Sequence, residues 1–150
     1  MLNNFLNLLS GTEPSRPEDK EHAGRVAIAA ILTEAAMADG IYAPEEQQKI
    51  GRILAQRFDL LEDEAAALRA EGQAAQSEAM DLVKFTRVVK DAVPFEERVS
   101  VIEAVWRVIY ADGDRDYEES AVVRKLCGLL YVPDRDSGLA RQRVVNGQPL

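Results

Sequence analysis

The sequence predicts an all-α fold, a single-domain helical bundle of about seven to eight helices. Apolar residues recur at helical spacing through most of the chain, and no segment shows the sustained alternation that is typical of a β-strand. Prolines and glycines interrupt this pattern where one helix has to end and the next begin. A short motif also occurs twice, as Ala38-Asp39-Gly40 with Glu45-Glu46 and as Ala111-Asp112-Gly113 with Glu118-Glu119. This internal repeat predicts two equivalent helical hairpins within the bundle.

Composition and charge restrict the classes of function. With 150 residues, 47% of them hydrophobic, the chain can form one hydrophobic core without a disulfide or a structural metal ion. The 26 acidic and 18 basic residues give a formal net charge of −8. A surface this acidic repels phosphate backbones, which disfavours nucleic-acid binding. Cys127 is the single cysteine, and its leucine-rich setting predicts a buried thiol without a disulfide.

Residues 1–16 are expected to be a short helix and a linker that precede the domain of residues 17–150. The helix is predicted from an apolar stripe of Leu2, Phe5, Leu6 and Leu9. It either docks on its own core or serves as an arm that binds a partner or touches a membrane surface. The segment lacks the pattern of a signal peptide, and no run in the chain approaches the roughly 18 apolar residues of a membrane span. We therefore expect no membrane span and a cytoplasmic location.

The first long helix is expected from Pro17 to about Ala38. Proline at the first helical position and acidic residues in the first turn suit a helix N-terminus. Between residues 26 and 38 only Thr33 and Glu34 are polar, so neighbouring helices must cover this helix on most sides. We expect it to be central. His22, the only histidine, is expected to be a solvated surface residue.

Gly40 is expected to end the central helix and Pro44 to begin the next one. The buried stripe of this second helix comprises Ile50, Ile53, Leu54 and Phe58. A third helix is predicted over residues 61–72, the least hydrophobic of the set, and we expect it at the edge of the bundle. Its buried face comprises Leu61, Ala65 and Leu68. The helical pattern breaks over residues 72–77.

The second half of the chain predicts four more helices, over residues 78–92, 95–111, 116–131 and 136–145. Pro94 separates the first two. The helix over 78–92 is expected to bury Met80, Val83, Phe85 and either Val88 or Val89. The helix over 95–111 is the counterpart of the first central helix, with Trp106 in the core and one polar stripe of Ser100, Glu103 and Arg107. Asp116 is the predicted N-cap of the next helix.

The two copies of the repeat align without gaps. Residues 28–54 overlay residues 101–127 with five identities, all of them at the turn. Glu34 and Arg107 fall at equivalent positions of the two central helices. We expect these two side chains to form a charged pair across a pseudo-twofold axis, since Glu34 would otherwise be an isolated carboxylate on an apolar helix.

The acidic residues of the two turns support two interpretations. In the first, the acids cap the helices or face their positive N-termini. In the second, their carboxylate oxygens bind a divalent metal ion, whose identity the sequence does not specify. The candidate metal ligands are Asp39, Glu45, Asp112 and Glu118, joined by Glu34, Glu46 and Glu119. Both interpretations remain open at this point.

Other kinds of site are not expected. Asp112, Asp114 and Asp116 resemble the start of an EF-hand loop, but Tyr117 and Val123 stand where that loop needs glycine and glutamate. No carboxylate is marked for acid–base catalysis, and there is no glycine-rich phosphate loop. We therefore expect neither an enzyme nor a bound organic cofactor.

Several stretches of the chain match the pattern of a known family. They are residues 35–40 with Glu45-Glu46, residues 95–98, residues 104–113 with Glu118-Glu119, and residues 129–132. In these stretches the chain resembles the tellurite-resistance TerB family, in particular its bacterial TerB-like branch. The resemblance implies a helical bundle with an internal duplication, acidic residues proposed to bind metal, and a link to tellurite resistance and stress.

Two functional hypotheses follow. The first is an accessory protein that binds or senses a divalent metal through the repeated acids. The second is a non-catalytic interaction module, because the resemblance also implies that TerB-like domains occur joined to chaperone-type modules. Its acidic face or N-terminal helix would dock a protein partner or a second copy of the chain.

Overall fold

The computed structural model describes residues 17–38, 42–79, 81–111 and 117–147 of the chain. These residues form seven α-helices, one short 3-10 helix and no β-strand, which confirms the predicted all-α bundle. The elements are α2 (Pro17–Ala36), α3 (Pro44–Phe58), α4 (Glu62–Ala79), α5 (Leu82–Ala92), η1 (Phe95–Glu97), α6 (Arg98–Ile109), α7 (Tyr117–Leu130) and α8 (Asp134–Val145). The short helix predicted within residues 1–16 lies outside the described part, and so does the predicted cap Asp116.

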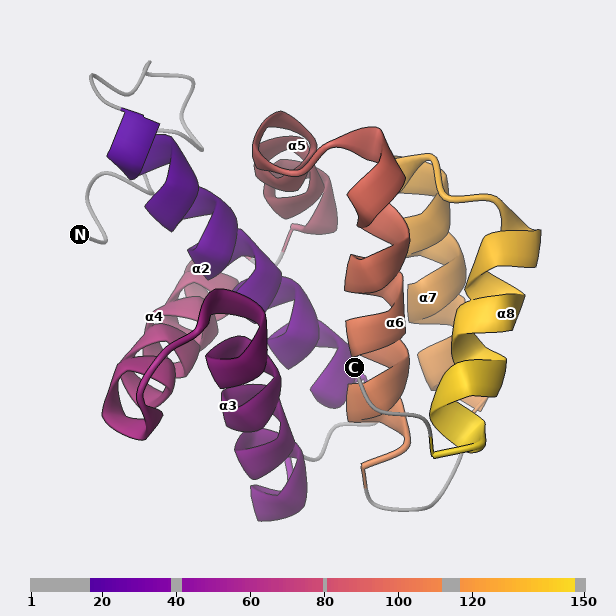
Figure 1. Cartoon of the computed structure of the whole chain (residues 1–150), viewed down its shortest axis with the longest axis horizontal. Helices are drawn as coiled ribbons and strands as arrows, with labels where there is room; N and C mark the ends of the chain where they lie inside the picture. Colours follow the sequence, from indigo (N-terminus) through magenta and orange to yellow (C-terminus); the bar gives the residue numbers. More distant parts are fainter. Residues whose placement is uncertain (1–16, 39–41, 80, 112–116, 148–150) are drawn as a thin grey trace.

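Helix α2 is the central helix of the bundle, as its sequence predicts. From Val26 to Ala36 every side chain is buried except that of Glu34, which is partly exposed. The helix packs against α3, α4, α5, α6 and α7. Figure 1 shows it running diagonally between the α3–α4 pair and the group of α6, α7 and α8. Its long apolar run therefore reflects contact on nearly all sides.

Helix α6 is the second central helix and packs against α2, α3, α7 and α8. Its residue Trp106 is buried, and the indole Nε1–H donates a hydrogen bond to Oγ of Ser137 in α8 over 3.2 Å. A buried indole N–H needs such an acceptor, so Ser137 completes the core position that the sequence predicts for Trp106.

Helix α4 continues to Ala79, through the segment 72–77 where the sequence pattern predicts a break. The predicted break is wrong because Gly72 has a packing role. A Cβ atom added to Gly72 would lie 2.4 Å from the Cβ of Ala29, so glycine lets α4 approach α2 closely. The exposed residue Leu61, at 69% relative exposure, is a second correction to the predicted buried face of this helix.

Helix α5 begins at Leu82 instead of near residue 78. Asp81 caps it, since the backbone N–H of Val83 donates a hydrogen bond to Oδ1 of Asp81 over 3.0 Å. Phe85 is fully buried as predicted, whereas Val83 is 42% exposed, so the predicted burial of Val83 is wrong. Val83 lies in the first turn of α5, on the outer face of the helix. Met80 lies outside the described residues.

The last two helices complete the bundle against α6. At the end of α7, Tyr131 takes a left-handed backbone conformation with φ 60°, and the N–H of Val132 donates to the carbonyl of Cys127 over 2.9 Å. Helix α8 begins at Asp134, slightly earlier than predicted. Across the described ranges, no helix has both the length and the apolar character that a membrane crossing requires.

Candidate functional site

The helix ends that flank the two repeated turns lie on one side of the bundle. Helices α2 and α6, which precede the two turns, pack against each other, and both end on the lower side in Figure 1. Helices α3 and α7, which follow the turns, begin on the same side. Asp39 and Asp112 lie outside the described residues, and so do the side chains of Glu118 and Glu119 in the first turn of α7. Metal binding by these four acids therefore stays a prediction.

Glu46, in the first turn of α3, is a capping residue. Its side chain is buried at 2% exposure, and its Oε1 accepts a hydrogen bond from the backbone N–H of Ala43 over 3.1 Å. This contact is one half of a capping box. Ala43 has no side-chain oxygen for the other half, and the N–H of Glu46 donates instead to the backbone carbonyl of Ala43 over 3.1 Å. The carboxylate also faces the positive end of the helix dipole, so at Glu46 the structure supports the capping interpretation.

Glu34 and Arg107 each pair with another residue, so the charged pair predicted between them is wrong. Glu34 accepts a hydrogen bond from Nε2 of Gln76 over 2.6 Å. Gln76 belongs to the part of α4 that the sequence pattern assigns to a break, which is why this partner was not predicted. Arg107 donates to Glu103, one turn earlier on α6, over 3.3 Å.

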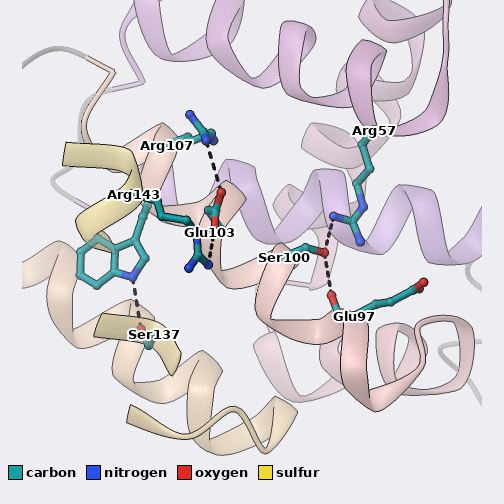
Figure 2. Close-up of polar contacts among 8 residues, drawn as sticks. Arg57, Glu97, Ser100, Glu103, Arg107, Ser137 and Arg143 are labelled. Carbon is teal, nitrogen blue, oxygen red and sulfur yellow. Dashed lines mark hydrogen bonds and ion pairs between the residues drawn. The ribbon is translucent and has the colours of Figure 1, made fainter. Parts of the chain in front are cut away.

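Glu103 is the centre of a small polar cluster between α6 and α8 (Figure 2). Its carboxylate accepts from Arg107 through one oxygen and from Arg143 through the other, the latter over 2.7 Å to Nε and 2.6 Å to Nη2. The glutamate side chain is only 13% exposed. Two cations thus compensate the cost of burying one carboxylate, and the predicted polar stripe of α6 is a helix–helix contact.

Glu45 lies in a mainly cationic setting. It lines a hollow of about 400 Å³ together with Lys49, Arg52, Arg107 and Tyr110. Burial lowers the pKa of Lys49, and the positive charges of Arg52 and Arg107 lower it further. Positive charges this close oppose the binding of another cation. Among the described residues no three carboxylates, histidines or cysteines gather into a possible metal site, so Glu34, Glu45 and Glu46 do not form one by themselves.

The lone histidine and the lone cysteine have structural surroundings. His22 lies at the surface with its side chain 32% exposed, and its Nε2 lies 3.0 Å from Oε2 of Glu71 in α4, a partner that the sequence does not predict. Cys127 is buried as predicted. Burial raises the pKa of its thiol, Asp134 adds to this, and a hydrogen bond with Ser137 opposes it. A thiol held protonated is a poor nucleophile.

Sequence reasoning missed two hollows on the surface. One is a groove of about 700 Å³ between α3 and the start of α4, with Gly51, Ala55, Ala65 and Ala66 among its lining residues. The other has a volume of about 760 Å³ and lies where α2, α3, α5 and α6 meet, with Arg25, Arg57 and Phe58 in its wall. The small residues on one helical face are a weak indication of the groove in the sequence. Nothing in the sequence signals the second hollow, because its wall comes from separate elements.

The chain is an all-helical domain with two central helices, α2 and α6. Each of them is followed by a similar acidic sequence. A family model described as tellurite resistance protein TerB matches residues 25–142. The match covers most of the chain, and the chain therefore belongs to the TerB family, as the sequence resemblance predicts. No curated protein and no solved structure matches the chain.

Proposed function

We propose that this chain is a non-catalytic accessory protein of the TerB family that acts by binding a helical segment of a partner protein. The observation that carries the proposal is the groove between α3 and α4, whose floor is made of small side chains. A Cβ atom added to Gly51 would meet nothing within 4 Å, so the groove is open at that point. Grooves of this kind between two helices receive the apolar face of an amphipathic helix.

The charges beside the groove indicate the chemistry of the partner. Arg52 and Arg69 border the apolar floor, and Glu62 is the one acidic residue in the lining. Arg52 is exposed, and Arg69 is oriented by a hydrogen bond from its Nη1 to Oε1 of Gln73 over 3.0 Å. A helix with bulky apolar residues on one face and acidic residues beside them would complement both features.

Site-specific cross-linking tests this proposal in cells. A photoreactive residue at Gln48, in the groove, is expected to give a discrete cross-linked product that the same residue at exposed Leu139 of α8 does not give. The product should disappear in a Gly51→Leu background, because leucine fills the groove while favouring the helix by roughly 0.8 kcal/mol. Identical products from Gln48 and Leu139, or a product that survives Gly51→Leu, would overturn the groove as the binding surface.

A second candidate function is binding of a divalent metal by Asp39, Asp112, Glu118 and Glu119. It is supported by the position of the four flanking helix ends on one side of the bundle (Figure 1). The test is a melting curve of chelator-treated protein with added calcium, magnesium, manganese or zinc. A rise with one ion that is absent from the Asp39→Ala, Asp112→Ala double variant would support metal binding. No rise with any ion would leave the groove as the functional surface.

A further inference from the structure

The hollow where α2, α3, α5 and α6 meet has two arginines over one aromatic ring. The guanidinium carbons of Arg25, from α2, and Arg57, from α3, lie 4.8 and 5.9 Å from the centre of the Phe58 ring. All three residues line the hollow of about 760 Å³. Its volume lies within the range of small-molecule sites in proteins. Stacking on the ring restricts both guanidinium groups, so they face the hollow with little conformational freedom.

The hydrogen bonds of these arginines leave capacity for an anion. Arg25 pairs with Glu21 through Nη2 over 2.9 Å, but within the described part of the chain its buried Nε has no hydrogen-bond partner. Arg57 donates from Nη1 to a neutral acceptor, Oγ of Ser100, over 2.9 Å (Figure 2). Burial also lowers the pKa of Arg57, while the charge of Glu97 opposes this. A carboxylate between the two guanidinium groups would accept hydrogen bonds from their terminal nitrogens, because the Nε of Arg25 is too deeply buried for a ligand to reach.

Other residues in the wall of the hollow carry the opposite charge. Asp91 at the end of α5 and Glu96 and Glu97 of η1 line it, and all three are exposed. A simple anion would meet repulsion from these carboxylates, and a simple cation would meet repulsion from the arginines. A molecule that carries one charge of each sign can pair with both sets of side chains.

We propose that this hollow binds a small zwitterionic molecule, with its carboxylate between Arg25 and Arg57 and its cationic group against Asp91, Glu96 and Glu97. The ligand class is therefore an amino acid or an amine-bearing carboxylic acid. The site is separate from the α3–α4 groove, and the two proposals stand or fall independently.

Three six-carbon probes of equal length test the proposal on the full chain. ε-Aminocaproate carries one carboxylate and one amine, adipate carries two carboxylates, and hexamethylenediamine carries two amines. Titration followed by amide chemical shifts and by calorimetry should show saturable binding of ε-aminocaproate, with the other two at least about tenfold weaker. Shifts should centre on Phe58, Ala92 and Ser100. No saturable binding of ε-aminocaproate, or equal binding of adipate, would overturn the proposed ligand class.

Two variants and one matched control locate the binding. Arg57→Gln removes a guanidinium group that would bind the carboxylate of the ligand. Glu96→Gln removes one of the exposed carboxylates that would bind its amine. Each variant should weaken ε-aminocaproate binding about tenfold. Arg52→Gln changes another arginine of α3, one that lies outside this hollow, and should leave the affinity unchanged. Since Glu96 is exposed, its variant is expected to fold normally. Unchanged affinity in Arg57→Gln and Glu96→Gln would contradict the site.

Discussion

Gly72 of α4 and Ala29 of α2 meet so closely that a Cβ atom on Gly72 would lie 2.4 Å from the Cβ of Ala29. The backbone of Ala29 and Ala30 is also within 3 Å of that position, with its nearest atoms at 2.7 and 2.8 Å. The neighbours are therefore two main-chain atoms and a Cβ atom fixed to the main chain, none of which can move aside as the end of a flexible side chain could. The contact between α2 and α4 depends on glycine at this one position.

Gly72→Ala is expected to destabilise the protein. Overpacking of this kind costs about 1–3 kcal/mol, which outweighs the roughly 1 kcal/mol that alanine gains over glycine in a helix. Gly51→Ala is the matched control, since that position is helical and open, and it should be neutral or stabilising. Urea unfolding measures both. A Gly72→Ala protein as stable as the control would refute the close approach of the two helices.

Ala43→Ser should stabilise the protein by about 0.5–1 kcal/mol, because it completes the capping box that Glu46 begins. The backbone at Ala43, with φ −69° and ψ 151°, already has the extended conformation of an N-cap. Thermal unfolding checks the gain. Ala43→Val lacks the hydroxyl and serves as the control, and an equal gain from valine would show that capping is not the cause.

A double-mutant cycle should couple Glu103 to Arg143 and leave Glu34 uncoupled from Arg107. Two nitrogens of Arg143 contact the same carboxylate oxygen of Glu103, and for this pair we expect an interaction energy of about 0.5–1 kcal/mol. Substitutions to glutamine at each position and at both positions, followed by urea unfolding, give this energy. If Glu34 and Arg107 showed an interaction energy of the same size, the two side chains would form a pair across the pseudo-twofold axis after all.

The stability contributed by Cys127 should fall at alkaline pH. Its pKa is raised in the folded protein, so above the unfolded value of about 8.5 the unfolded chain loses the thiol proton first. The contribution is complete below that pH and decreases as the pH rises toward the folded pKa. Unfolding free energies of the wild type and Cys127→Ala at neutral and alkaline pH should converge or cross in this direction. A pH-independent difference between the two proteins would contradict the raised pKa.

The parts of the fold that could be predicted from the sequence are those that depend on local pattern. The long apolar run before Glu34 required a central helix, and the prolines at residues 17 and 44 stand where α2 and α3 begin. Gly72 misled the prediction because a glycine that ends a helix and a glycine that lets two helices touch look alike in one sequence. Only the contact with Ala29 distinguishes them.

The candidate site was less predictable, because partners depend on which helices pack together. The pairing of Glu34 with Gln76 follows from the extension of α4, and the cations around Glu45 come from both α3 and α6. The arginine pair at Phe58 likewise joins α2 and α3. The internal duplication stays a prediction, since both of its turns lie largely outside the described residues.

Growth on tellurite tests the central claim most directly, namely that the groove between α3 and α4 is the functional surface of this TerB-family protein. Cells that lack the gene would be complemented with the wild type, Gly51→Leu, Gly128→Leu or the Asp39→Ala, Asp112→Ala double variant. Gly128 is an open helical glycine of α7 away from the groove, so its variant is the matched control. We predict that Gly51→Leu alone fails to restore resistance. Full resistance with Gly51→Leu and loss of resistance with the double variant would contradict the claim and support metal binding at the repeated turns.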